Sequence, residues 1–113
     1  MEHLFNPLSM VAIVFIIVGI LTFIFPPKTI NTLYGYRTKT SMKNQQTWDF
    51  AQVYSSKKMI VIGLVMLLLS LNFIVIDFTG NQIIIIGLII IGFSVGYLIL
   101  KTENAIRSEF KES

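Results

Sequence analysis

Three long apolar stretches dominate the chain, and polar segments separate them. Residues 8–25, 59–76 and 83–100 contain no Asp, Glu, Lys or Arg, and each stretch is 18 residues long. As helices rising about 1.5 Å per residue, they reach about 27 Å, close to the thickness of a hydrocarbon core. Three strands cannot close a barrel, whereas each helix satisfies its own backbone in lipid. The pattern predicts an all-α integral membrane protein with three transmembrane helices, forming one membrane domain over residues 1–113.

The first apolar stretch is interpreted as a retained span and not as a cleaved leader. Glu2 and His3 stand before it in place of basic residues, and no small-residue cleavage pattern follows Phe25. Pro26 and Pro27 are expected to end this helix, because neither has a backbone N–H to donate.

The basic residues predict how the chain is oriented. Six of the nine Lys and Arg residues lie in the 33-residue loop 26–58, and the other three lie in the tail 101–113. They are Lys28, Arg37, Lys39, Lys43, Lys57 and Lys58 in the loop and Lys101, Arg107 and Lys111 in the tail. Short basic loops stay on the cytoplasmic side of membranes. We therefore expect a multi-pass membrane protein, with a cytoplasmic loop and tail and an external N-terminus.

The second and third spans are expected to form a tight antiparallel hairpin. Only residues 77–82 join them, and Gly80 and Asn81 are turn formers. The third span also carries Gly92 and Gly96 at the GxxxG spacing, which lets helix backbones approach closely. Two interpretations of this pair stay open: packing within the monomer, or the seam of a homodimer.

Composition excludes several classes of function. Charged residues make up 13% of the chain, against about 25% in soluble domains. The net charge of +3 comes from residues that flank the apolar stretches, so lipid headgroups explain it better than nucleic acid. Cysteine is absent, and the single histidine, His3, lies near the N-terminus, so neither thiol chemistry nor a metal site is expected. No enzyme or cofactor is expected, and spans without charge disfavour proton-coupled transport.

The loop 26–58 is longer than a connector between two helices needs to be, which favours a function. Its aromatic residues argue against disorder. Ser41 and Asn44 resemble a helix start, and a moderately amphipathic helix is expected from about Asn44 to Ser56. Trp48 falls on its broader apolar face and Gln52 on its polar face. Such a helix either lies in the headgroup plane or extends the second span into the cytoplasm.

The loop also carries a specific motif. It consists of Asn31, Tyr34-Gly35-Tyr36-Arg37-Thr38, Ser41, Asn44, Trp48 and Ala51, placed between a first span and two further spans. This arrangement resembles the SdpI family of bacterial membrane proteins, and the resemblance covers nearly the whole chain. Gln52 departs from the family pattern, in which Asn is frequent at that position.

The resemblance implies immunity to a secreted peptide toxin of the cannibalism type. In the signalling version of such proteins, the toxin-bound membrane protein captures a cytoplasmic repressor. The expected partners are therefore the lipid bilayer, a peptide toxin, a repressor protein and a second copy of the chain. The alternatives are an accessory or structural subunit of a membrane complex and a small transporter that is not proton-coupled.

Most motif residues have both a structural and a binding interpretation. Arg37 suits a carboxylate or phosphate partner, or equally a lipid phosphate at the membrane surface. Gly35 is expected to supply a positive-φ turn. Trp48 is interpreted first as an anchor at the membrane interface and second as a binding platform. Asn31, Ser41 and Asn44 are expected to cap turns or bind loop backbone in preference to a ligand.

Overall fold

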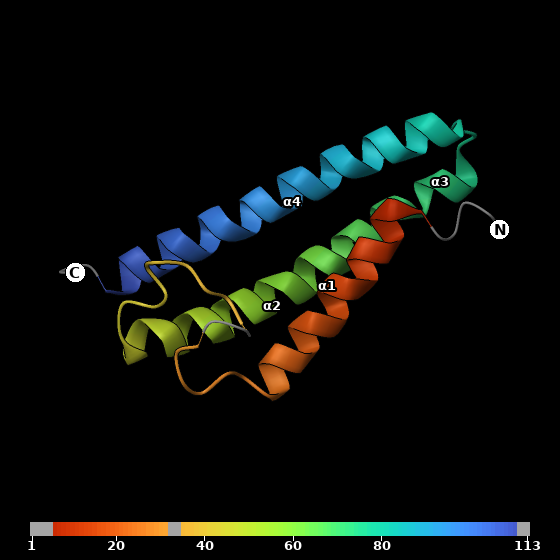
Figure 1. Ribbon diagram of the computed structural model, residues 1–113. Helices are drawn as coiled ribbons and strands as arrows, with labels where there is room; N and C mark the ends of the chain where they lie inside the picture. Colours follow the sequence, from red (N-terminus) through yellow and green to blue (C-terminus); the bar gives the residue numbers. More distant parts are fainter. Residues whose placement is uncertain (1–5, 32–34, 111–113) are drawn as a thin grey trace.

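The computed structural model describes residues 6–31 and 35–110, and these residues form helices and connecting segments without strands (Figure 1). The helices are α1 (Pro7–Ile24), α2 (Gln45–Ser70), α3 (Asn72–Val75) and α4 (Gly80–Glu109). Three helical segments are long and apolar enough to cross a membrane, namely Pro7–Ile24, Gln45–Val75 and Gly80–Glu109. The predicted all-α fold with three spans is confirmed.

Reciprocal side-chain caps explain where the first and last helices begin. The Asn6 Oδ1 accepts from the Ser9 backbone N–H at 3.0 Å, and the Ser9 Oγ accepts from the Asn6 N–H at 3.0 Å. Thr79 and Gln82 form the same pair at the start of α4, at 3.2 and 3.0 Å. Such caps satisfy backbone N–H groups that have no partner within the helix. Pro7, at the first position of α1, has no N–H to satisfy.

The amphipathic segment of the loop is the first part of α2 and not a separate helix. Asn44 caps α2, which runs without a break from Gln45 to Ser70. Of the two interpretations, extension of the second span is therefore confirmed, and a helix lying in the headgroup plane is wrong. The span breaks at Leu71 and continues as the short α3. There Asn72 donates its side-chain amide to the Leu69 carbonyl at 3.0 Å, so this polar group is satisfied locally.

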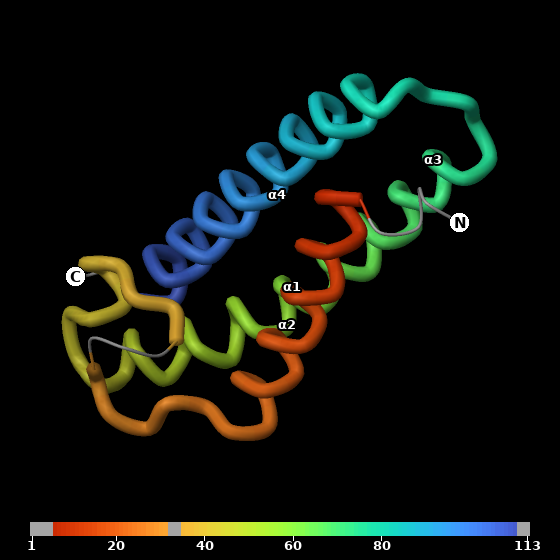
Figure 2. Tube along the Cα trace, turned by 45° about the vertical axis from the view of Figure 1, so that its right-hand side comes forward, coloured from red at the N-terminus to blue at the C-terminus, as the bar shows by residue number. Residues whose placement is uncertain are grey.

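The helices are arranged as a hairpin of α2 and α4 with α1 packed mainly against α2 (Figure 2). The turn between α3 and α4 lies at the same end as the start of α1. The segment that precedes α2 lies at the opposite end, beside the last turns of α4. The tight hairpin is thus confirmed. A buried apolar core joins the three long helices through Leu8, Ala12, Ile62, Met66, Phe73, Ile83 and Leu98.

The helices α1 and α2 pack closely at two glycines, each of which meets the opposite helix. A Cβ added at Gly19 would lie 2.7 Å from the Ile60 Cγ1, and one at Gly63 would lie 2.7 Å from the Ile16 Cγ1. Among the described residues, nothing lies within 4 Å of the corresponding positions at Gly92 and Gly96. The interpretation that Gly92 and Gly96 pack within the monomer is therefore wrong, and the homodimer seam stays a prediction.

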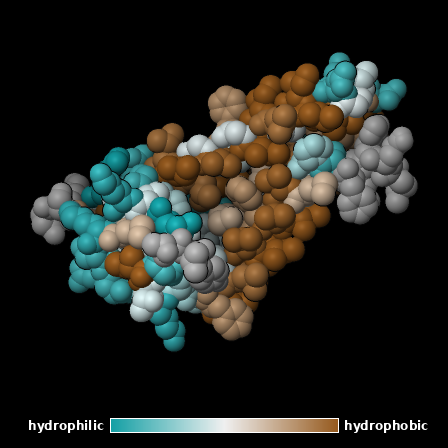
Figure 3. Space-filling model, viewed as in Figure 1, coloured by the Kyte–Doolittle hydropathy of each residue, from teal (hydrophilic) through white to brown (hydrophobic). Residues whose placement is uncertain are grey.

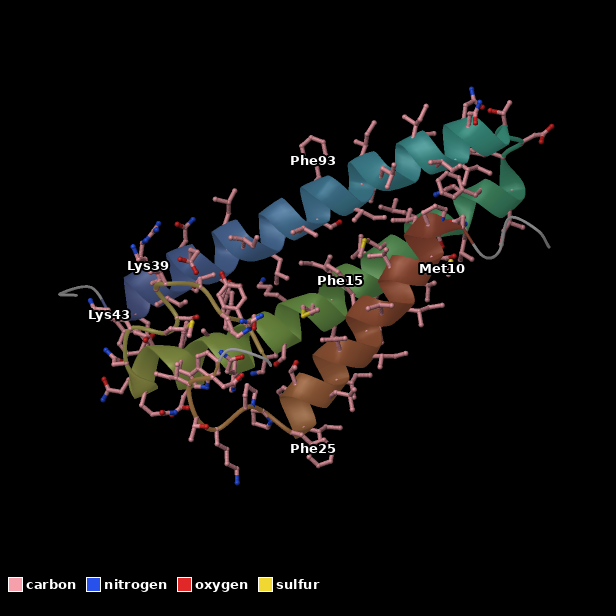
Figure 4. The ribbon with its side chains drawn as sticks, in the orientation of Figure 1. Met10, Phe15, Phe25, Lys39, Lys43 and Phe93 are labelled. Atoms are coloured by element: carbon pink, nitrogen blue, oxygen red, sulfur yellow. The ribbon has the colours of Figure 1, made fainter. Side chains whose placement is uncertain are left out.

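The surface of the middle of the molecule is apolar, while polar residues gather at the two ends (Figure 3). Phe93 is 78% exposed and Phe25 is 67% exposed, and both project away from the bundle (Figure 4). In water, such a continuous apolar surface would cause association, whereas hydrocarbon solvates it without cost. The fold is that of a membrane protein.

Candidate functional site

Trp48 binds the first residues of the loop to α2. Its side chain is fully buried, and the indole Nε1–H donates to the Pro27 carbonyl at 2.8 Å. Because Trp48 lies in the first turn of α2, this bond joins the residues that follow α1 to the start of the next helix. The interpretation of Trp48 as an anchor at the membrane interface is wrong. Its ring stabilises the fold of the loop itself.

Gln52, one turn further along α2, binds the motif directly. The Tyr36 N–H donates to the Gln52 Oε1 at 2.8 Å, and the Gln52 Nε2 donates to the Tyr36 carbonyl at 2.8 Å. The side-chain amide thereby pairs with both backbone groups of one residue, as a neighbouring strand would. Gln52 is 2% exposed, so its placement on a polar outer face was wrong.

The glycine of the motif is required by this contact. Gly35 has φ +102°, the positive φ expected from the sequence, in a region that side chains rarely adopt. A Cβ at this position would also lie 2.5 Å from the Gln52 Oε1 and 2.7 Å from the Pro27 Cγ. A side chain at residue 35 would therefore displace the amide that holds Tyr36.

Glu103 of α4 holds the motif from the other side. The Tyr36 hydroxyl and the Thr38 Oγ1 both donate to the Glu103 Oε2 at 2.7 Å. These bonds cross 67 and 65 residues of chain, respectively. The loop is thus bonded to α2 through Gln52 and to α4 through Glu103, and it bridges the two helices at this end of the bundle.

The electrostatics fix the protonation states of this bridge. Burial and the neighbouring Glu103 carboxylate raise the pKa of Tyr36 well above its usual range, so its hydroxyl remains a donor. Partial burial opposes ionisation of Glu103, but hydrogen bonds from Thr38, Tyr36 and Thr40, together with the Arg107 charge, outweigh it and lower the pKa of Glu103. The carboxylate is therefore ionised at neutral pH and accepts both hydroxyl groups.

A compact turn follows the motif and is held by Ser41. The Thr38 N–H donates to the Ser41 Oγ at 2.8 Å, and the Ser41 N–H donates to the Thr38 Oγ1 at 3.1 Å. Asn44 then caps α2 by a reciprocal pair with Thr47, at 2.9 and 3.1 Å. The side chains of Ser41 and Asn44 therefore bind backbone, in agreement with the structural interpretation.

Two other motif residues have different surroundings. Asn31 donates its side-chain amide to the Thr29 carbonyl at 3.0 Å, so it also binds loop backbone. Arg37 is exposed, and it lies between Tyr36 and Thr38, which are both bonded to Glu103. Its neighbours thus fix the place from which its side chain extends. The remaining motif residue, Tyr34, lies outside the described residues.

An apolar cleft separates the two helices that the loop bridges. It has a volume of about 420 Å³ and lies between α2 and α4. Val61, Val65 and Leu69 contribute its α2 side, and Ile90, Phe93, Ser94 and Tyr97 its α4 side. The lining lies within the apolar stretches of both spans. The arrangement therefore combines a polar, folded loop at one end with an apolar cleft between the same two helices.

Removing the charge of Glu103 is expected to loosen the loop. Glu103→Gln keeps the shape of the side chain but weakens the two hydroxyl contacts, which should lower the free energy of unfolding by about 1 kcal/mol in this partly exposed setting. The measurement is thermal unfolding in detergent micelles, followed by the fluorescence of Trp48. Glu109→Gln, which removes the same charge from an exposed position on α4, should leave the midpoint unchanged.

The lowered pKa of Glu103 adds a pH dependence to this prediction. In the wild type, the contribution of Glu103 to stability is fully present above the ordinary pKa of a glutamate, and it is lost as the pH falls through the lowered pKa of the folded state. That part of the acid dependence should be missing in Glu103→Gln and retained in Glu109→Gln. Equal pH profiles for the two variants would contradict the bridge.

Comparisons with known proteins match the part of the chain that contains the loop. The model of the SdpI/YfhL protein family matches residues 28–100, more than half of the chain. The uncharacterized protein YfhL of Bacillus subtilis (strain 168) is 55% identical over 51 residues, which is 45% of this chain and 46% of that protein. The chain thus matches just under half the length of this curated relative. No solved structure matches the chain.

Proposed function

Because the chain belongs to the SdpI/YfhL protein family, we propose that it is a membrane immunity protein that gives resistance to a secreted antimicrobial peptide toxin of the cannibalism type. In this proposal the loop and the C-terminal tail are cytoplasmic, because all nine Lys and Arg residues lie there, and the N-terminus is external. The three spans and the family membership support an immunity role. The toxin itself is identified only by its chemistry, a membrane-active peptide.

One observation supports this function beyond family membership. The motif loop is bonded to both helices that line the apolar cleft, through Gln52 on α2 and Glu103 on α4. An apolar peptide segment that entered the cleft from the membrane would change the separation of these helices. Because the loop bridges them, its shape would change with that separation. Toxin binding in the membrane would thereby be coupled to the cytoplasmic face.

Arg37 is the residue that we propose to present this change to a partner. It is exposed, and its backbone position depends on the bonds of Tyr36 and Thr38 to Glu103. A guanidinium group forms paired hydrogen bonds with a carboxylate, which suits the acidic surface of a cytoplasmic repressor protein. Sequestration of the toxin in the cleft and capture of a repressor by the loop are then two coupled outputs of the same protein.

The test is survival of a toxin-sensitive bacterium that expresses the chain and is exposed to a purified cannibalism-type peptide. Wild type should protect, and Val65→Trp, which fills the cleft, should reduce protection at matched membrane abundance. Leu64→Trp is its control, because Leu64 has similar exposure but does not line the cleft. Arg37→Ala should reduce signalling, and Lys28→Ala removes an exposed charge of the same loop outside the motif as its control.

The outcomes separate immunity from the other classes of function. Protection that Val65→Trp loses and Leu64→Trp keeps would support the cleft as the toxin site. No protection from abundant wild-type protein would reject immunity and favour an accessory subunit, which should then co-purify with a stoichiometric partner in mild detergent. Protection that depends on export of the peptide into the medium would favour a small transporter that is not proton-coupled.

A further inference from the structure

A second feature of the polar end is a basic pocket formed by the loop and the last turns of α4. It has a volume of about 480 Å³, and its lining includes the cationic side chains of Lys39, Lys43 and Arg107. Ile106 and Phe110 supply its apolar wall, and no acidic residue of the described ranges 6–31 and 35–110 lines it. Figure 4 shows Lys39 and Lys43 together at this end of the molecule. The pocket is distinct from the apolar cleft between α2 and α4.

The fold holds these cations in place. Lys39 lies within the turn that Thr38 and Ser41 close by their reciprocal hydrogen bonds, and Lys43 follows this turn. The Met42 N–H also donates to the Thr38 carbonyl at 3.0 Å, so the backbone that carries Lys39 and leads into Lys43 is fixed. Three like charges around one concavity repel one another, and a bound anion would relieve that repulsion.

Structural roles for the individual charges do not explain why three cations line one pocket. Arg107 lies in the last turn of α4, where a cation is favoured by the helix C-terminus, and it follows Glu103 by one turn. These contacts explain Arg107 alone. The carboxylate of Glu103 already accepts from Tyr36 and Thr38, and the two lysines come from a different segment of the chain. These roles do not explain why the lysines of the loop and Arg107 of α4 line the same pocket.

We propose that this pocket binds a phosphate group. A phosphate offers three or more acceptor oxygens at once, which matches one guanidinium fork and two ammonium groups better than the two oxygens of a carboxylate. Arg107 lies about 10 Å along α4 beyond Leu100, the last residue of the apolar stretch, so the pocket lies beyond that stretch on the polar side. Both an anionic phospholipid headgroup and a soluble phosphate compound can reach that depth, and they share the chemistry that the pocket recognises.

The test uses the full chain in maltoside micelles, which contain no phosphate, with thermal unfolding followed by Trp48 fluorescence. The soluble ligand is glycerol 1-phosphate, compared with sodium chloride at equal ionic strength. The lipid ligand is dioleoyl phosphatidic acid, compared with dioleoylglycerol, which has the same tails without phosphate. Lys39→Gln/Lys43→Gln should weaken binding by about tenfold or more, since each lost contact is a charge-assisted hydrogen bond. Arg107→Gln alone should weaken it similarly.

The control is Lys28→Gln/Lys57→Gln, which removes two positive charges from the same loop at positions that do not line the pocket. Saturable stabilisation by either phosphate ligand that the pocket variants lose and the control keeps would support the site, and the ligand that acts would identify the source. Equal binding by pocket and control variants would overturn it. So would stabilisation by neither ligand, which would instead favour the acidic surface of a protein partner.

Discussion

Replacing Trp48 by alanine is expected to lower the free energy of unfolding by about 3–5 kcal/mol, the usual cost of deleting a buried aromatic side chain. The Trp48 side chain is fully buried, and its indole N–H satisfies the Pro27 carbonyl. The alanine variant therefore loses apolar packing and leaves an acceptor without its partner. Because Trp48 is the only tryptophan, far-UV circular dichroism during SDS titration in mixed micelles is the suitable measurement.

Two further variants separate the parts of this effect. Trp48→Phe keeps most of the ring but lacks the N–H, so it should cost about 1–2 kcal/mol. Phe93→Ala removes an aromatic ring that is 78% exposed on α4, and it should change the free energy of unfolding little. If Trp48→Ala proved no more destabilising than Phe93→Ala, the tryptophan would not be enclosed as the structure places it.

The fold could be predicted because its causes are local along the chain. An uncharged stretch long enough to cross a bilayer predicts its own helix, since backbone groups in lipid must bind within the segment. The short connection before α4 then predicts the hairpin. The start of α2 near Asn44 could be predicted in the same way, because a cap acts on residues only three positions away. The break at Leu71 had no such signal, since α3 continues the same apolar stretch.

The bridge between loop and helices could not be predicted, because its partners are far apart in sequence. In the sequence, Glu103 is one charged residue in a basic tail, and nothing near it indicates that its partner is Tyr36. Gln52 was placed on a polar face because a helical wheel ranks residues by polarity. Whether a side-chain amide can be buried depends on the hydrogen-bond partners that it finds, which here are both backbone groups of Tyr36. Neither the helical wheel nor the departure from the family's frequent Asn indicates that Gln52 is buried against the motif.

The glycines illustrate the same distinction. The GxxxG spacing predicts a packing face at Gly92 and Gly96, yet no described residue lies within 4 Å of a Cβ added at either position. Gly19 and Gly63, each without a glycine four residues away, are the positions at which α1 and α2 pack closely. Spacing shows that a helix has a face of small residues, but it does not show which face another helix covers. Which face is covered depends on how the neighbouring helix packs.

Replacing Gly63 by leucine is therefore expected to lower the free energy of unfolding by about 2–3 kcal/mol, in the range of overpacked cores. The Cβ alone would lie 3.0 Å from the Ala12 carbonyl oxygen and 3.1 Å from the Ile16 nitrogen. Backbone atoms of α1 cannot move aside as the end of a flexible side chain can, so the two helices must separate. SDS titration followed by Trp48 fluorescence measures the loss.

Gly92→Leu is the matched control, because it makes the same substitution within an apolar stretch. No described residue lies within 4 Å of a Cβ added at Gly92. It should leave the unfolding midpoint nearly unchanged, since the added side chain meets detergent or lipid. Cross-linking of the same two variants tests the homodimer seam separately: loss of a dimer in Gly92→Leu with unchanged monomer stability would support that seam. Equal destabilisation by both substitutions would mean that α1 does not pack on Gly63, and the close crossing of α1 and α2 would have to be abandoned.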